Sequence, residues 1–205
     1  MIRRPPRSTP GPVTTSGREP ERTVVVVGDG RDQLEKQLAG RATVVVQEPQ
    51  LGTGHAVQQA EAALAGFAGD VLVLYADVPF VRADTMRAMI ERLHVPDDSA
   101  DIVVLAFEPE DTLEYGRVMA NGGRISWMVE YKDASEGERA CRLCNSGLMA
   151  VRSELLFGLL LQLGNDNAQG EYYLPDIVNV DIRQGGACSV INTGDPDVVD
   201  GINSS

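Results

Sequence analysis

The chain has 205 residues, of which 43% are hydrophobic, and a formal net charge of −12 at pH 7, so it is long and apolar enough to form one α/β core. The acidic balance excludes a nucleic-acid groove, which needs a basic surface, but it permits a phosphate-bearing small molecule held through a divalent cation. No apolar run approaches transmembrane length, the basic N-terminus lacks the hydrophobic segment of a secretory signal, and the three cysteines suit a cytoplasmic protein.

Residues 1–22 differ in composition from the rest of the chain. They are rich in Pro, Arg, Ser, Thr and Gly and have neither helical nor strand periodicity, which predicts a disordered or non-native leader. We expect residues 23–205 to form a partial domain. Within it, the apolar runs 23–27 and 42–46 predict strands, and the segment 31–39 between them predicts a short helix.

The loop 51–55, Leu-Gly-Thr-Gly-His, joins the second strand to a helix that we expect to end near residue 67. An apolar stripe at helical spacing supports this helix. A glycine-flanked Thr at a strand-to-helix junction exposes backbone N–H groups beside the positive end of a helix, so this loop can approach a base or a phosphate closely. The alternative is an ordinary tight connection with Thr53 as a cap.

The run Val71–Tyr75 is apolar without alternation, and Ala-Asp-Val-Pro follows it. This pattern is typical of a strand buried on both faces of a parallel α/β sheet, with Pro79 ending the strand. Ligands in open α/β sheets bind beyond the carboxyl ends of strands, so Asp77 lies at the expected position of a site. The alternative is that Asp77 caps a helix or forms a turn.

After this strand, the alternation of strands and helices continues to residue 107 and then changes. A helix over 84–93 and an apolar strand over 102–107 predict a parallel, three-layer α/β domain. Short strands over 115–119 and 124–132, joined by a hairpin turn at 121–123, then predict an antiparallel arm inserted into a mostly parallel sheet.

The last third of the chain returns to α/β alternation. Residues 144–151 predict a strand, and the apolar helix after it is expected to begin with Ser153 as N-cap. Pro175 at its start and Gly185 just past its end delimit the last long helix, and 187–192 predict a final strand.

Seven motifs follow one another along the chain. They are Gln-x-x-Gln-Leu-Gly-Thr-Gly-His-Ala (47–56), Leu-Tyr-Ala-Asp-Val-Pro (74–79), Tyr-Gly-Arg (115–117), Val-Glu-Tyr-Lys-Asp-Ala (129–134), Asn-Ser-Gly (145–147), Asn-Ala-Gln-Gly-Glu-Tyr-Tyr-Leu-Pro-Asp (167–176) and Gly-Ile-Asn (201–203). In this order they resemble the uridylyltransferase domain of the bifunctional bacterial GlmU family over about residues 23–203. The first and sixth motifs are the most diagnostic, and composition explains neither.

The resemblance implies a Rossmann-like, GT-A-like nucleotidyltransferase that depends on Mg²⁺. Its substrates are UTP and N-acetylglucosamine 1-phosphate, and its products are pyrophosphate and UDP-N-acetylglucosamine, a precursor of peptidoglycan and hence of the cell wall. The implied partners are therefore small molecules, with no nucleic acid and no membrane. The resemblance leaves the oligomeric state open, because the β-helix domain through which the family trimerises has no counterpart in this sequence.

By the same resemblance, Gln47, Gly52 and Thr53 lie at the uracil. An amide side chain and loop N–H groups can pair with the donor and acceptor edge of a pyrimidine. Asp77 and Asn203 are implied to bind Mg²⁺, and Asn203 also to contact the sugar-nucleotide. One carboxylate and one amide suffice because Mg²⁺ completes its shell with water and phosphate.

The sugar is implied to contact Gly116, Glu130 and Asn145, with Tyr75 flanking the sugar-nucleotide. Glu130 can accept from hydroxyls, Asn145 can pair with hydroxyl or amide groups, and Gly116 lets the chain come close. Each residue type also has an ordinary structural explanation: Glu130 as an exposed strand carboxylate, Asn145 as a turn residue and Asn203 as a loop residue.

Two parts of the family pattern have no counterpart in this sequence. The family's first strand and its glycine-rich loop, with an Arg and a later Lys that hold the triphosphate, should precede Thr23, where the sequence has a Pro- and Arg-rich segment instead. The hexapeptide repeats of the family's acetyltransferase domain do not follow Asn203. We therefore expect a fragment truncated at both ends, with impaired uridylyl transfer. Ala76 and Ser146 are smaller departures, replacing a Gly and a Thr.

Two alternatives to this function remain. The chain could be a catalytically silent fragment that binds nucleotide-sugars, or a related nucleotidyltransferase with another base or sugar.

Cys141 and Cys144 form a Cys-x-x-Cys pair, but it precedes a strand and has no second pair to complete a zinc site, so packing is the favoured interpretation. His55 and His94 show no base–nucleophile pattern, and His55 is expected to be a first-turn helix residue.

Overall fold

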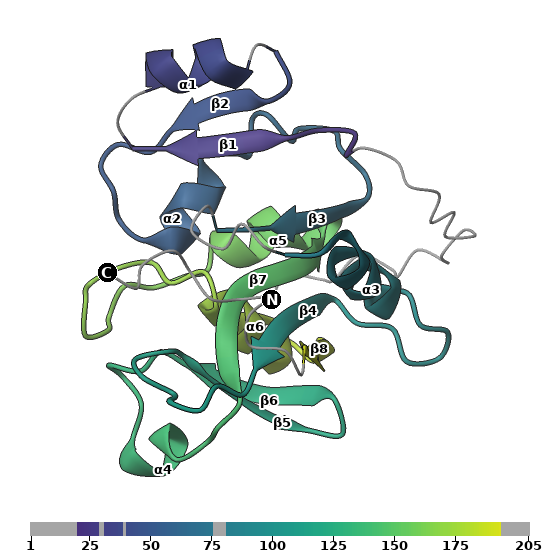
Figure 1. Ribbon diagram of the computed structural model, residues 1–205, viewed down its shortest axis with the longest axis vertical. Coiled ribbons are helices and arrows are strands. Elements are labelled where there is room, and N and C mark those ends of the chain that lie inside the picture. The colour runs from purple at the N-terminus through teal and green to yellow at the C-terminus, as the bar shows by residue number, and fades with distance from the viewer. Residues whose placement is uncertain (1–19, 29–30, 39, 76–80, 194–205) are drawn as a thin grey trace.

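The computed structural model describes residues 20–28, 31–38, 40–75 and 81–193 (Figure 1). The first half of the described chain contains β1 (Val24–Val27), α1 (Arg31–Leu38), β2 (Thr43–Val46), α2 (Thr53–Gln58), β3 (Asp70–Val73), α3 (Ala83–Leu93) and β4 (Ile102–Phe107). The second half contains β5 (Arg117–Asn121), β6 (Arg124–Val129), α4 (Glu136–Arg139), β7 (Cys144–Arg152), α5 (Ser153–Leu160), α6 (Asp176–Arg183) and β8 (Cys188–Asn192). Among these ranges, no helix has the length and apolar character that crossing a membrane requires.

Six strands form one mixed sheet in the order β3-β7-β4-β8-β6-β5. β4 pairs in parallel with β8 and antiparallel with β7, and β7 is also antiparallel to β3. The strands β3, β4 and β8 therefore point the same way, and β7 runs against them between β3 and β4. β1 and β2 form a parallel pair of their own within the described ranges.

The three-layer α/β fold and the antiparallel arm are confirmed, but the sheet is mixed rather than mostly parallel. The arm is the antiparallel pair β5–β6, in which Arg117 lies opposite Val129. β7 begins where β4 ends, because Phe107 lies opposite Cys144. The chain leaves β4, forms the arm and re-enters the sheet at the same end, so β7 has to run in the opposite direction. Apolar patterning marks a strand as buried but does not carry its direction.

Helices cover both faces of this sheet, and Figure 1 shows α3 on the side opposite α5 and α6. Ile102 and Val104 of β4 belong to the cluster formed with α5 and α6, whereas Val103 and Leu105 belong to the cluster formed with α3. All four side chains are fully buried. The absence of polar alternation in this strand therefore follows from its position at the centre of three layers.

The expected boundaries hold for α6 but not for α5. Pro175 precedes α6, and Gly185 follows it with a φ of +79°, which a glycine adopts without strain. Ser153, expected as the N-cap of α5, is instead the first residue of the helix, after Arg152. Its hydroxyl accepts a hydrogen bond from the Gly69 amide at 3.1 Å. Ser153 therefore joins α5 to the start of β3, a contact that no local sequence pattern announces.

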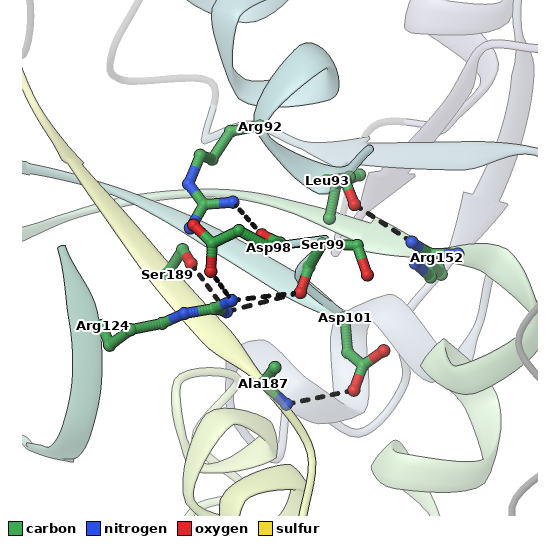
Figure 2. A network of polar contacts seen from close by, with 9 residues as sticks. All are labelled: Arg92, Leu93, Asp98, Ser99, Asp101, Arg124, Arg152, Ala187 and Ser189. Atoms are coloured by element: carbon green, nitrogen blue, oxygen red, sulfur yellow. Dashed lines mark hydrogen bonds and ion pairs between the residues drawn. The ribbon is translucent and has the colours of Figure 1, made fainter. Parts of the chain in front are cut away.

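A network of charged and polar side chains fixes the arm to the sheet (Figure 2). The Asp98 carboxylate accepts from Arg92 of α3 at 2.9 Å and also from Arg124, the first residue of β6. Arg124 donates in addition to the Ser189 hydroxyl of β8 at 3.2 Å. In the described chain β6 and β8 share the single register pair Arg124 and Ser189, so these side-chain contacts reinforce a short strand pairing.

A second contact places the far end of β6. Asn179 of α6 is almost fully buried. Its Oδ1 accepts from the Met128 amide at 2.9 Å, and its Nδ2 donates to the Met128 carbonyl at 2.7 Å. The side chain thus satisfies both backbone groups of a buried strand residue, as a neighbouring strand would.

Replacing Asn179 by Leu should lower the free energy of unfolding by about 2 to 4 kcal/mol, because two buried backbone groups of Met128 lose their partners. Denaturant unfolding of the two proteins measures the difference. The matched control is Gln37→Leu on an exposed face of α1, which should stay within about 0.5 kcal/mol of the parent. Equal stability of the Asn179→Leu protein and the parent would show that water replaces the lost bonds.

Candidate active site

The 47–55 segment turns back on itself at the end of β2. The Gln47 side chain donates to the Gly52 carbonyl at 2.9 Å, and its Nε2 lies 3.0 Å from Nδ1 of His55. Gln59 contacts the other ring nitrogen of His55 at 3.1 Å. The structure thus brings Gln47 and Gly52 together as expected. It also gives His55 a structural role in the first turn of α2, the position that the sequence indicated.

The helix after this loop is shorter than expected. α2 ends at Gln58, and turns continue toward residue 66 in place of a helix that reaches residue 67. The amides of Gln59 and Ala60 bond three residues back rather than four, which is the tighter 3₁₀ type of hydrogen bond. An apolar stripe fits both kinds of turn, so it did not distinguish them.

A set of three hydrogen bonds, called here the junction, joins this loop to the segment 172–174. The Tyr172 amide donates to the Leu51 carbonyl at 2.8 Å, and the Gly54 amide donates to the Tyr172 carbonyl at 2.7 Å. The Leu174 amide donates to the Thr53 hydroxyl at 2.9 Å. The Thr53 side chain is therefore engaged within the fold, as are the Leu51 and Gly52 carbonyls and the Gly54 amide.

Gly52 is required by this close approach. Its φ is +108°, and a Cβ at this position would lie 2.8 Å from the Tyr172 carbonyl oxygen. A side chain here would both strain the backbone and push the two segments apart.

Gly116, Glu130 and Asn145 lie together between the arm and the start of β7. The backbone amide of Asn145 donates to the Gly116 carbonyl at 2.9 Å. A Cβ on Gly116 would lie 3.2 Å from both carboxylate oxygens of Glu130, so the carboxylate packs against the glycine backbone. Asn145 is buried, and its Oδ1 accepts from the Gly147 amide at 3.0 Å. The three residues expected at a sugar therefore form one cluster.

Tyr75 lies beside this cluster. A Cβ on Gly147, whose φ is +83°, would lie 2.5 Å from the Tyr75 ring, so the ring rests on the backbone two residues after Asn145. Tyr75 also packs against both apolar cores. The expected metal residues Asp77 and Asn203 lie outside the described residues. Within the described ranges, no group of three His, Cys, Asp or Glu side chains is placed to hold a metal ion.

A cavity of about 270 Å³ opens beside Glu130, between β6, α6 and the segment 162–167. Burial, reinforced by the Asp176 and Asp133 carboxylates, raises the pKa of Glu130. Burial also raises the pKa of Asp176, against the lowering effect of Arg183. The cavity wall is therefore acidic and poorly hydrated, which suits uncharged hydroxyl and amide groups better than phosphate.

Tyr173 belongs to the 167–176 motif, but the sequence predicts no role for it. It lines the cavity and is 8% exposed, and its buried hydroxyl has no hydrogen-bond partner within the part of the chain that the structure describes. Burial, together with Asp133 and Glu130, raises the pKa of Tyr173 to about 12. Its place in the sixth motif, next to Tyr172, is the one signal that could have pointed to it.

The structure gives no catalytic surroundings to the Cys141–Cys144 pair or to His94. Cys144 is buried, and burial raises the pKa of its thiol, which disfavours the thiolate that redox or zinc chemistry needs. His94 lies 2.7 Å from Asp70 at the start of β3, where it closes the end of α3. These contacts agree with packing roles.

Replacing Glu130 by Gln should stabilise the protein at neutral pH. A raised pKa means that the folded state favours the protonated carboxyl, so the stability linked to it is present below the ordinary value of about 4.3 and is lost as pH rises through the folded value. Thermal unfolding from pH 4 to 7.5 should show a higher Tm for Glu130→Gln at neutral pH, with the gap closing in acid.

Glu138→Gln is the matched control of opposite sign. The hydrogen bonds from Ser135 lower the pKa of Glu138 in the capping box at the start of α4, so its stability is present above the ordinary value and lost as pH falls. Gln at this position should lower Tm at neutral pH. A Glu130→Gln protein that melts below its parent at neutral pH would contradict the raised pKa.

Comparison with known proteins shows the family to which the chain belongs. Residues 14–169 match the family model of the MobA-like NTP transferase domain, a match that begins within the proposed leader. The protein named bifunctional protein GlmU from Novosphingobium aromaticivorans is 69% identical over 185 residues, covering 90% of this chain and 41% of that protein. The GlmU of Sphingopyxis alaskensis is 62% identical over the same coverage. The chain thus spans about two fifths of the length of these relatives.

Two solved structures share the fold at 17% identity. The inositol-1-phosphate CTP transferase from T. maritima has a TM-score of 0.62, covering 85% of this chain and 67% of its own. A UDP-glucose pyrophosphorylase complexed with UDP-glucose has a TM-score of 0.58, covering 83% and 73%. The resemblance to GlmU is confirmed by these relatives, and the chain belongs to the family of MobA-like NTP transferase domains.

Proposed function

We propose that this chain carries the site that transfers a uridylyl group from UTP to N-acetylglucosamine 1-phosphate, giving UDP-N-acetylglucosamine and pyrophosphate. The observation that carries the proposal is the junction, which fixes the 51–54 loop against the segment that leads to the Glu130 cavity. A transferase that joins a nucleotide to a sugar phosphate needs a nucleotide loop and a sugar cavity held side by side. The similarity to GlmU supports the choice of these two substrates.

The uracil half is assigned to Gln47, Gly52 and Thr53. The bond from Gln47 to the Gly52 carbonyl keeps the amide group at the turn of the loop. The Thr53 hydroxyl is occupied by Leu174, so Thr53 would act through its backbone. An amide and nearby backbone groups supply both donors and acceptors, which a pyrimidine edge requires.

The sugar half is assigned to Gly116, Glu130, Asn145 and Tyr75. The Oδ1 atom of Asn145 is engaged by Gly147, so its amide nitrogen is the group that would donate to the sugar. Glu130 would accept from hydroxyls beside the open backbone of Gly116, and the Tyr75 ring would flank the sugar-nucleotide.

We propose that Mg²⁺ is bound by Asp77 and Asn203, the latter also contacting the sugar-nucleotide. A carboxylate and an amide oxygen form a donor set that suits this ion, with water and phosphate completing the shell. When bound, the ion would neutralise phosphate charge and align the two reactants. The acidic wall of Glu130, Asp133 and Asp176 would repel phosphate, so we place the phosphates toward the end of β3 and away from the cavity.

In the transfer, a phosphate oxygen of the sugar phosphate attacks the α-phosphorus of UTP, and pyrophosphate leaves. The chain's own residues would bind and orient the two substrates, because this chemistry needs alignment and charge neutralisation more than a strong general base. A cytoplasmic location and small-molecule partners belong to the same proposal. The cytoplasmic location is supported by the free thiols of Cys141, Cys144 and Cys188, which suit a reducing compartment.

A second candidate function is binding of the nucleotide-sugar without turnover. The observation that favours it is charge: none of the described residues assigned to the uracil and sugar halves is Lys or Arg, and Arg183 is the one basic side chain among the described residues that line the cavity. A triphosphate normally meets several such side chains. A third candidate is a related nucleotidyltransferase with another base or sugar.

Titration with UDP-N-acetylglucosamine, run beside a pyrophosphate-release assay, separates these functions. The transferase proposal predicts binding together with Mg²⁺-dependent pyrophosphate release from UTP and N-acetylglucosamine 1-phosphate. Asn145→Ala should weaken product binding about tenfold, the effect of losing one or two hydrogen bonds to a ligand. The exposed residue Gln37 supplies the control Gln37→Ala, which should bind like the parent.

Each candidate function has its own outcome in these assays. Binding without pyrophosphate release supports the silent binding function and contradicts the transferase. Faster release with CTP or with glucose 1-phosphate supports the third candidate. Failure to bind any of these ligands contradicts all three.

A further inference from the structure

The loop between α5 and α6 is closed by one of its own side chains. The Asn167 Nδ2 donates to the Glu171 carbonyl at 2.6 Å, while its Oδ1 accepts from the amides of Gln169 and Glu171, both at 3.2 Å. Gly170 completes the turn with a φ of +69°. Residues 164–171, called here the 164–171 loop, are therefore closed by hydrogen bonds within the loop itself.

The turn that follows the arm contacts this unit through the carboxylate of Asp133. Asp133 lies in a turn just after β6, where its amide donates to the Glu130 carbonyl at 3.1 Å. Its Oδ1 accepts from the Ala168 amide at 2.9 Å. Asp133 thus bonds to the backbone of Glu130 on one side and to the 164–171 loop on the other.

These contacts join the two walls of the cavity beside Glu130. One wall comes from the arm and includes Trp127, Glu130 and Asp133, and the other comes from the segment 162–167. At its far end, the loop continues into residues 172–174 and is held there by the junction. The junction therefore holds the segment that follows the loop, and Asp133 holds the loop itself at Ala168, four residues before Tyr172.

The cavity holds a polar group for which a fixed wall matters. Among the described residues, the buried Tyr173 hydroxyl has no hydrogen-bond partner within normal distance. The Gln169 amide donates to Asn167 but lies close enough to the Tyr173 hydroxyl to lower its pKa slightly against the effect of burial. An unpaired buried donor costs free energy, which a ligand that accepts from it can recover. This recovery requires that the wall carrying Tyr173 stay at a set distance from Glu130.

We propose that Asp133 is a positioning residue: by accepting from the Ala168 amide, it ties the 164–171 loop to the arm and so sets the separation of Glu130 and Tyr173 across the cavity. Its part in substrate binding rests on the proposed function, under which the ligand is the sugar phosphate. Its part in fixing the loop does not. The essential feature is an oxygen acceptor, which Asn also supplies, and not the negative charge.

The test compares Asp133→Ala with Asp133→Asn in the full chain. Hydrogen exchange of the Ala168 amide, followed by NMR, reports the tether directly, because a free amide exchanges faster than a bonded one. Asp133→Ala should speed this exchange at least about tenfold. Asp133→Asn, which keeps an acceptor oxygen, should exchange like the parent. Glu61→Ala removes an exposed carboxylate from another part of the surface and is the control.

Ligand binding gives the second measurement. Trp127 is the only tryptophan of the chain, lines the cavity and is 40% exposed, so its fluorescence reports ligands there. Asp133→Ala should weaken N-acetylglucosamine 1-phosphate about tenfold, as for a lost hydrogen bond, and leave UMP binding unchanged. Asp133→Asn should restore the sugar phosphate affinity. General loss of structure would lower both affinities together.

The two measurements can fail separately. Unchanged Ala168 exchange in Asp133→Ala overturns the tether, whatever the ligands do. Equally fast exchange in the Ala and Asn proteins overturns it as well, since charge would then be the essential feature. If exchange behaves as expected but N-acetylglucosamine 1-phosphate does not bind the parent, the tether stands and the proposed function fails.

Discussion

The junction between the 51–54 loop and the 172–174 segment is the contact on which the site depends. Leu174 and Thr53 are 121 residues apart in the chain, so only a packed core can bring them together. Each of the three hydrogen bonds contributes about 1 kcal/mol net, but a broken one leaves a buried backbone group unpaired at a greater cost. The fold therefore holds the two segments at one separation, which Gly52 makes possible by carrying no side chain.

The sequence carried most of the fold because the central strands are buried on both faces. The run Ile102–Phe107 was predicted at the bounds the structure shows, since full burial leaves no room for polar alternation. The direction of β7 was not predictable, because it depends on where the chain re-enters the sheet after the arm. Ser153 was misassigned for a related reason: its partner, Gly69, lies 84 residues away, and a capping rule considers only neighbours.

Motif order predicted which residues gather at the site, but not how they are held there. Gly116, Glu130 and Asn145 do form one cluster, a grouping that came from resemblance rather than from periodicity. The contributions of Asp133 and Tyr173 arise from burial and from a contact across the cavity, which a linear pattern does not contain. Asp77 and Asn203 lie outside the described residues, so their role as magnesium ligands stays a prediction.

The central claim is that the 51–54 loop, held in place by the junction, forms one site with the cluster of Gly116, Glu130 and Asn145, although these segments are distant in the sequence. Titration with UDP-N-acetylglucosamine, followed by NMR of the backbone amides, tests it most directly. The expected result is that the amides of Gly52 and Gly54 and those of Gly116 and Asn145 shift together, with one dissociation constant. Shifts confined to one of the two groups, or two different dissociation constants, would contradict the claim.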